Sequence, residues 1–147
     1  MLATRRRQVP QDIIVRLRRA CLALPEAQEQ SAWVGTRWQV RKKTFVHVLM
    51  VDSGWPPAYA RAAGCSGPAC VMTFRSPLPQ LDLHAYTWEP FFRPGWWPNI
   101  VGMRLGGGTD WNQVAALVTE SWRVVAPKKL AEAFSTRVPR HPRPATT

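Results

Sequence analysis

Two stretches of apolar residues at helical spacing, one near each end of the chain, are what most constrain its fold. In the later stretch, residues 110–126, apolar side chains recur at the i, i+3, i+4 and i+7 positions that form one face of an α-helix. The stripe consists of Trp111, Val114, Leu117, Val118, Ser121, Trp122 and Val125. Thr109 or Asp110 is suited to cap the first turn, because a side-chain oxygen there accepts from free backbone N–H groups. We therefore predict an amphipathic helix that ends before Pro127.

The earlier stretch predicts a helix over residues 12–24. Asp12 lies at its start, where a carboxylate is favourable, and Pro25 stops it. Its apolar face consists of Ile13, Ile14, Leu17, Ala20, Cys21 and Leu24.

The middle of the chain has the alternating or β-branched character of strands. The predicted strands are 36–41, 45–51, 71–75 and 100–105. Arg41, Lys42 and Lys43 form the turn between the first two, and a short helix is predicted over 77–86. Consecutive strands between helices indicate an α+β domain of two layers, an antiparallel sheet with helices packed on one face.

The remaining segments predict loops and arms around one domain. Residues 26–35 and 52–69 are expected to be loops, and Gly106 to Gly108 a turn. The domain covers 11–134, a length that can bury a core without disulfides. We expect residues 1–10 to be a flexible basic arm and 135–147 a disordered, basic, proline-rich tail.

Several motifs along the chain resemble the MmcQ/YjbR family of small bacterial proteins. They run from Cys21 to Ala27, from Phe45 to Val51, through Trp97 and 101–105, and through Asp110-Trp111 and 121–130. The likeness covers residues 11 to 132. It implies a YjbR-like fold, related in shape to the frataxin-like sheet-and-helix layer, and a family described as DNA-binding, with no catalytic residue and no cofactor. The family commonly carries a Lys on the strand Thr73–Arg75, where this chain has Arg75.

The charge of the chain is strongly positive, with 20 Lys and Arg against nine Asp and Glu, a net charge of +11. A field of this sign attracts polyanions. Scattered solvated charge explains the numbers equally well. If the first and last helices pack together, the basic blocks form one face that binds phosphates without sequence preference. The residues predicted to bind nucleic acid are Arg18, Arg19, Arg41, Lys42, Lys43, Arg75, Lys128 and Lys129.

An aromatic, proline-rich segment supplies the alternative hypothesis. Residues 87–97 contain Trp88, Phe91, Phe92, Trp96 and Trp97. Exposed rings could stack on unpaired bases, but large aromatic side chains are mostly core filler, so we expect these to plug one end of the core. With the 52–69 loop, the segment would otherwise make the chain a protein-interaction or small-ligand-binding module.

No motif predicts an enzyme. The histidines His47, His84 and His141 lack the partners that nucleophilic catalysis needs. Cys65 and Cys70, even with His84, match no strong zinc pattern. The odd number of cysteines, three, and the absence of a signal peptide or long apolar run predict a cytoplasmic protein without a membrane partner. We expect a non-enzymatic monomer with no metal and no cofactor.

Overall fold

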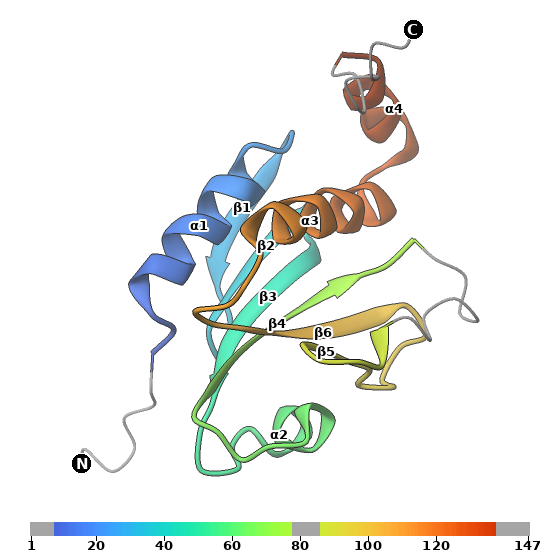
Figure 1. Ribbon diagram of the computed structural model, residues 1–147. Coiled ribbons are helices and arrows are strands. Elements are labelled where there is room, and N and C mark those ends of the chain that lie inside the picture. The colour runs from blue at the N-terminus through green and yellow to red at the C-terminus, as the bar shows by residue number, and fades with distance from the viewer. Residues whose placement is uncertain (1–7, 78–85, 138–147) are drawn as a thin grey trace, which may run out of the picture.

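A computed structural model of the chain describes residues 8–77 and 86–137 (Figure 1). The predicted short helix at 77–86 and most of both predicted arms lie outside these residues. The described elements are α1 (Gln11–Leu22), β1 (Ala27–Ser31), β2 (Thr36–Val40), β3 (Lys43–Val51), α2 (Pro57–Ala63), β4 (Ala69–Arg75), β5 (Phe91–Phe92), β6 (Ile100–Leu105), α3 (Trp111–Val125) and α4 (Lys128–Arg137).

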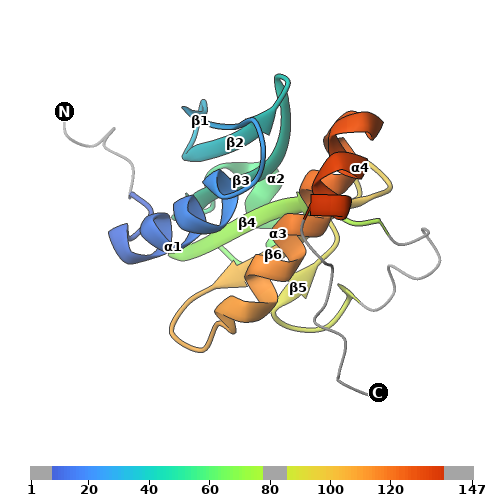
Figure 2. The ribbon, with the colours of Figure 1, turned by 90° about the horizontal axis from the view of Figure 1, so that it is seen from above.

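The strands form one open sheet in the order β1-β2-β3-β4-β6-β5, with every neighbouring pair antiparallel. α1 and α3 lie side by side against one face of this sheet (Figure 2). The α+β class and the two-layer arrangement predicted from the sequence are therefore confirmed.

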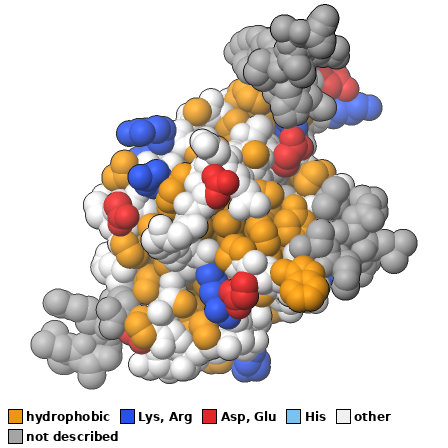
Figure 3. All heavy atoms as spheres, viewed as in Figure 1, with side chains coloured by type: hydrophobic (Ala, Val, Ile, Leu, Met, Phe, Trp, Pro, Cys, Tyr) orange, Lys and Arg blue, Asp and Glu red, His pale blue; other side chains and the backbone are white. Residues whose placement is uncertain are grey.

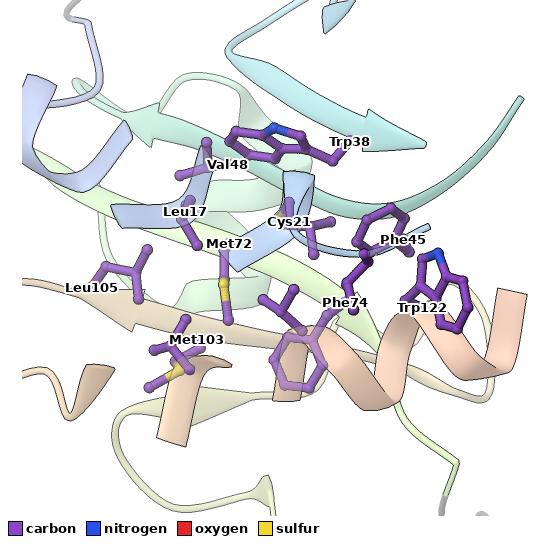
Figure 4. Packing of buried hydrophobic residues seen from close by; sticks show 14 of the residues in the cluster. Leu17, Cys21, Trp38, Phe45, Val48, Met72, Phe74, Met103, Leu105 and Trp122 are labelled. Carbon is purple, nitrogen blue, oxygen red and sulfur yellow. The ribbon is translucent and has the colours of Figure 1, made fainter. Parts of the chain in front are cut away.

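The main core lies between the sheet and these two helices (Figure 4). Leu17 and Cys21 of α1, Trp38 of β2 and Trp122 of α3 are all completely buried there. Burying side chains of this size is the main source of stability for the domain. Asp110 caps α3 as predicted, because its side chain accepts from two backbone N–H groups in the first turn of the helix.

A smaller core covers part of the opposite face of the sheet. Leu49, Val51 and Val71 point to this side, where residues of α2 and the ring of Phe92 pack on them. α2 lies within the segment 52–69, which was predicted to be a loop. Its seven residues begin with Pro57 at the first position and end at Ala63, and Gly64 follows in the left-handed conformation, so proline and glycine here bound a short helix.

Two further elements differ from the sequence-based expectation. Residues 26–35 were predicted to be a loop, but they contain the edge strand β1. β1 is almost entirely polar, and it forms because its backbone pairs with β2 from Ala27 to Ser31. α4 begins directly after Pro127, and Leu130, Ala131 and Phe134 pack it against the main core. It extends through residue 137, across the predicted start of the tail.

Candidate nucleic-acid interface

The turn between β2 and β3 places three of the predicted cationic residues at one end of the sheet. Arg41 and Lys42 have positive φ angles of 51° and 68°, as the two central residues of a tight hairpin turn require. Lys43 follows as the first residue of β3. All three are exposed.

A cleft of about 470 Å³, here called the basic cleft, brings Lys43 together with Arg75 from the end of β4. Its other walls are Thr44, Asn99, Val124 and Val125. The backbone N–H of Arg75 donates to Ser121 Oγ at 2.8 Å, and its guanidinium Nη1 donates to Asn99 Oδ1 at 2.8 Å. Arg75 is therefore held in a defined position, and no carboxylate of the described residues pairs with it.

The start of α4 adds further positive charge beside the basic cleft. Val124 borders both the cleft and a second hollow that contains Arg123 and Lys128. Lys128 and Lys129 are exposed in the first turn of α4, and among the described residues neither forms an ion pair. A helix N-terminus also carries partial positive charge, while Glu132 of α4 adds one negative charge to the lining of the second hollow. Arg123, by contrast, lies over the Phe134 ring at 5.0 Å and joins α3 to α4.

Two predicted cations have their guanidinium groups bonded to carboxylates. Arg18 donates to both oxygens of Glu29, at 2.9 and 3.0 Å. Glu29 also accepts from the indole N–H of Trp38 at 3.0 Å, and its bonds to Arg18 and Trp38 lower its pKa. Arg41 forms the same two-oxygen pair with Glu26, whose pKa that contact lowers. These pairs link α1 to β1 and β1 to the hairpin turn.

The side of the molecule that Figure 3 shows does not carry one basic surface. On this side Lys and Arg side chains lie in separate small groups, several beside Asp or Glu, with hydrophobic side chains between them (Figure 3). Arg19 is exposed in the last turn of α1. Packing of α1 against α3 therefore does not merge the basic blocks of the described residues on this side. The cations that the structure does gather lie around the basic cleft.

The opposite face of the sheet contains a second concave region, here called the tryptophan hollow. It has a volume of about 340 Å³ and shares Thr44 and Arg75 with the basic cleft. Its walls include Trp33, Trp96 and Trp97, and its floor includes Arg37, His47, Tyr59 and Thr73. Among the described residues no carboxylate belongs to its lining, while Arg37 and Arg75 both do.

The exposure of these indoles corrects the expectation that the aromatic segment plugs the core. Trp97 is 60% exposed, Trp96 39%, and Trp88, which lies outside the hollow, 71%. Only Phe92 of this segment is buried, because its ring packs directly on Gly102 of β6. Phe92 thus anchors the segment, whereas its tryptophans lie at the surface.

The floor of the tryptophan hollow is a row of residues across neighbouring strands. Arg37 of β2 pairs with His47 of β3, His47 with Thr73 of β4, and Thr73 with Gly102 of β6. Side chains at paired positions lie on the same face of a sheet. Neither Arg37 nor Trp33 was predicted from the sequence to bind a ligand. The sequence does show polar residues at alternating positions within apolar strands, which indicates one shared face. The strand order was needed to show that these residues lie side by side.

His47 is fixed in this floor by two hydrogen bonds. Its Nε2 lies 2.6 Å from the carbonyl oxygen of Val34, so this nitrogen carries the proton. Nδ1 therefore accepts from the Tyr59 hydroxyl at 3.2 Å. Burial lowers the pKa of His47 and raises that of Tyr59. His47 and Tyr59 are therefore neutral and fixed in position, and the positive charge of the hollow comes from Arg37 and Arg75.

The cysteines form no site among the described residues. Cys21, Cys65 and Cys70 are all free, and burial raises the pKa of Cys70 to about 12, which keeps its thiol protonated. No group of three His, Cys, Asp or Glu side chains within 8–77 and 86–137 could hold a metal ion. In the same residues, no helix is long and apolar enough to cross a membrane.

The fold and these surfaces define a small α+β protein with a basic cleft and an adjoining aromatic hollow. The chain belongs to the YjbR family, whose model matches residues 22–124, more than half of its length. This confirms the family that the sequence motifs indicated. No curated protein and no solved structure matches the chain.

Proposed function

We propose that this YjbR-family protein binds nucleic acid through its basic surface, as a cytoplasmic monomer without catalytic activity. The observation that carries the proposal is the basic cleft. Lys43 and Arg75, from different strands, line one concavity, with Lys128 and Lys129 beside it. A concentration of cations at one end of a chain with a net charge of +11 favours contact with a phosphate backbone.

The predicted cations differ in how well their surroundings support this function. Lys42, Lys43, Arg75, Lys128 and Lys129 make no ion pair with a described carboxylate. Arg18 and Arg41 would have to give up a bidentate carboxylate partner before binding a phosphate, so we assign them a structural role. Arg19 stays available but lies on α1, on the helix-covered face.

The test is binding to duplex DNA across a salt series, followed by fluorescence anisotropy. We expect the logarithm of the binding constant to fall linearly with the logarithm of the salt concentration, by about 0.9 for each phosphate contact. Lys43→Gln should weaken binding to all sequences alike and reduce this slope by about one. Arg61→Gln is the matched control, because Arg61 is equally exposed but lies on α2, far from α4 (Figure 1). Affinity that does not change with salt, or an equal effect of both substitutions, would contradict the proposal.

A second candidate function is the protein-interaction or small-ligand-binding module. The tryptophan hollow favours it, because Trp96 and Trp97 of the aromatic segment and Tyr59 of α2 meet there. Its volume is at the lower end of the range of about 300–1,000 Å³ for ligand pockets. We place this function second. The hollow contains arginines and, among the described residues, no carboxylate, so it suits an anionic ligand, and nucleic acid is such a ligand.

A further inference from the structure

We propose that the tryptophan hollow binds single-stranded nucleic acid, with bases stacked on Trp33 and Trp97 and phosphates bonded by Arg37 and Arg75. This inference rests on the proposed nucleic-acid binding and specifies the form of nucleic acid and the surface that receives it. It assigns a role to the face of the sheet that contains the hollow. Of the cations predicted from the sequence to bind nucleic acid, Arg75 alone lines this hollow.

The indole rings around the tryptophan hollow are exposed. Trp33 is 83% exposed and Trp97 60%, although apolar surface of this size is normally buried. Both line the same hollow, together with the partly exposed Trp96. Exposed rings around one concavity are typical of surfaces on which successive bases stack, because every base offers a π-face.

The lining of the tryptophan hollow also carries positive charge. Arg37 and Arg75 are the charged residues of the lining. A guanidinium group matches the oxygens of a phosphate with two parallel hydrogen bonds. Arg37 uses Nη2 in a bond of 3.2 Å to Gln30 Oε1, an exposed and neutral partner, and Arg75 uses Nη1 toward Asn99. Neither group pairs with a carboxylate of residues 8–77 or 86–137, so both retain their charge for an anionic ligand.

The floor of the tryptophan hollow is rigid. Tyr59 packs edge-on against Trp96 with ring centroids 4.8 Å apart, and its hydroxyl bonds to His47, which is itself bonded to the Val34 carbonyl. The floor is therefore preorganised, which reduces the entropy cost of binding. His47 contributes shape and hydrogen bonds, whereas Arg37 and Arg75 supply the charge.

The continuity of the two concave regions favours a strand over a free nucleotide. Thr44 and Arg75 belong to both the tryptophan hollow and the basic cleft. A chain whose bases occupy the hollow can continue past Arg75 toward Lys43. In a duplex the faces of the bases are covered by stacking on neighbouring base pairs, so an unpaired strand fits this surface and a duplex does not.

The experiment measures binding of an oligo(dT) of about ten nucleotides, within the usual size of a single-strand site, and of a duplex of equal length. We expect tighter binding of oligo(dT). Trp33→Ala and Trp97→Ala should each weaken it about 5- to 150-fold, the effect of one lost stacking contact. Trp97→Phe should retain most of the affinity, because a ring remains. Trp88→Ala is the matched control, since Trp88 is as exposed but lies outside the hollow, and should bind like the wild type.

Arg37→Gln provides an independent readout, because Arg37 belongs to the hollow and not to the basic cleft. We expect weaker oligo(dT) binding and a salt slope reduced by about 0.7, the value for one phosphate of a single strand. Unchanged thermal unfolding of each variant shows that the fold is intact.

The outcomes separate this inference from the proposed function. If neither oligo(dT) nor duplex binds at low salt, both fail. If duplex binds and the Trp33 and Trp97 variants bind oligo(dT) like the wild type, only the present inference fails. Thymidine monophosphate bound as tightly as oligo(dT) would also overturn it, in favour of a small-ligand pocket.

Discussion

The hydroxyl of Ser121, buried in α3, donates a hydrogen bond of 2.6 Å to the backbone carbonyl of Phe45 in β3. The same oxygen accepts from the backbone N–H of Arg75 in β4 at 2.8 Å. Val46 and Phe74 are the last pair of the β3–β4 ladder, and Phe45 is the extra residue of a bulge opposite β2. Ser121 therefore joins two strands through a helix, at the point where their own pairing stops.

Replacing Ser121 should reveal the cost of this bridge. Ser121→Ala leaves a buried carbonyl and a partly buried N–H without their partner, so we expect the free energy of unfolding to fall by about 1–3 kcal/mol. Urea unfolding followed by tryptophan fluorescence measures it. Thr119→Ala is the control, because the Thr119 hydroxyl bonds only within α3, to the Ala115 carbonyl, and its loss should change stability by less than about 0.5 kcal/mol. Equal effects of the two substitutions would contradict the bridging role.

The regular elements were predictable where the hydrophobic pattern is strong. The stripe of α3 and the apolar run of β3 each identify an element within a few residues of its observed bounds. β1 was missed because it lies at the edge of the sheet, and its Gln and Glu residues are stabilised by pairing with β2 rather than by burial. α2 and α4 were missed because short helices next to prolines carry little periodic signal.

The candidate site was predictable in its charge but not in its arrangement. The sequence identifies Lys43 and Arg75 as cations, but only the strand order brings them into one cleft. Glu26 and Glu29 were placed in or beside a loop, so their pairing with Arg41 and Arg18 was not foreseen. The tryptophan hollow depends on which face of the sheet each strand residue occupies, and this follows from the register between distant segments.

The carboxylate of Glu29 should make stability depend on pH. Its folded pKa lies below its ordinary value of 4.5, because Arg18 and Trp38 bond to the charged form. A lowered pKa means that the unfolded chain binds protons more readily, so the contribution of Glu29 is present above pH 4.5 and is lost as the pH falls through the folded pKa. Glu29→Gln should therefore be less stable than the wild type at pH 7, and this difference should shrink as the pH falls below 4.5.

The measurement is urea unfolding of both proteins at a series of pH values between neutrality and strong acid. Gln28→Ala is the control, because Gln28 is the exposed neighbour on β1 and carries no charge. Its difference from the wild type should not vary with pH. A difference between Glu29→Gln and the wild type that is equally constant would show that the Arg18 pair does not stabilise the fold. Added salt should reduce the difference at pH 7, because Arg18 is 43% exposed and the pair is screened.

Gly102 should be required for full stability, because the ring of Phe92 packs directly on it. The two residues are partners in the β5–β6 ladder, and a Cβ added at Gly102 would come within 2.2 Å of two carbon atoms of the Phe92 ring. Gly102→Ala must displace this ring, so we expect the free energy of unfolding to fall by roughly 1–3 kcal/mol, as for other overpacked cores. Gly107→Ala is the matched control, because open space surrounds that position, and it should be nearly neutral.

A second substitution distinguishes overpacking from a general intolerance of β6 to side chains. Combining Gly102→Ala with Phe92→Leu removes the Cε2 and Cζ atoms that the new methyl group meets, so the double variant should lose less stability than the sum of the single losses. Strict additivity would mean that the ring is not the obstacle. Because Phe92 anchors the segment that carries Trp96 and Trp97, Gly102→Ala should also change the tryptophan fluorescence of the folded protein, whereas Gly107→Ala should not.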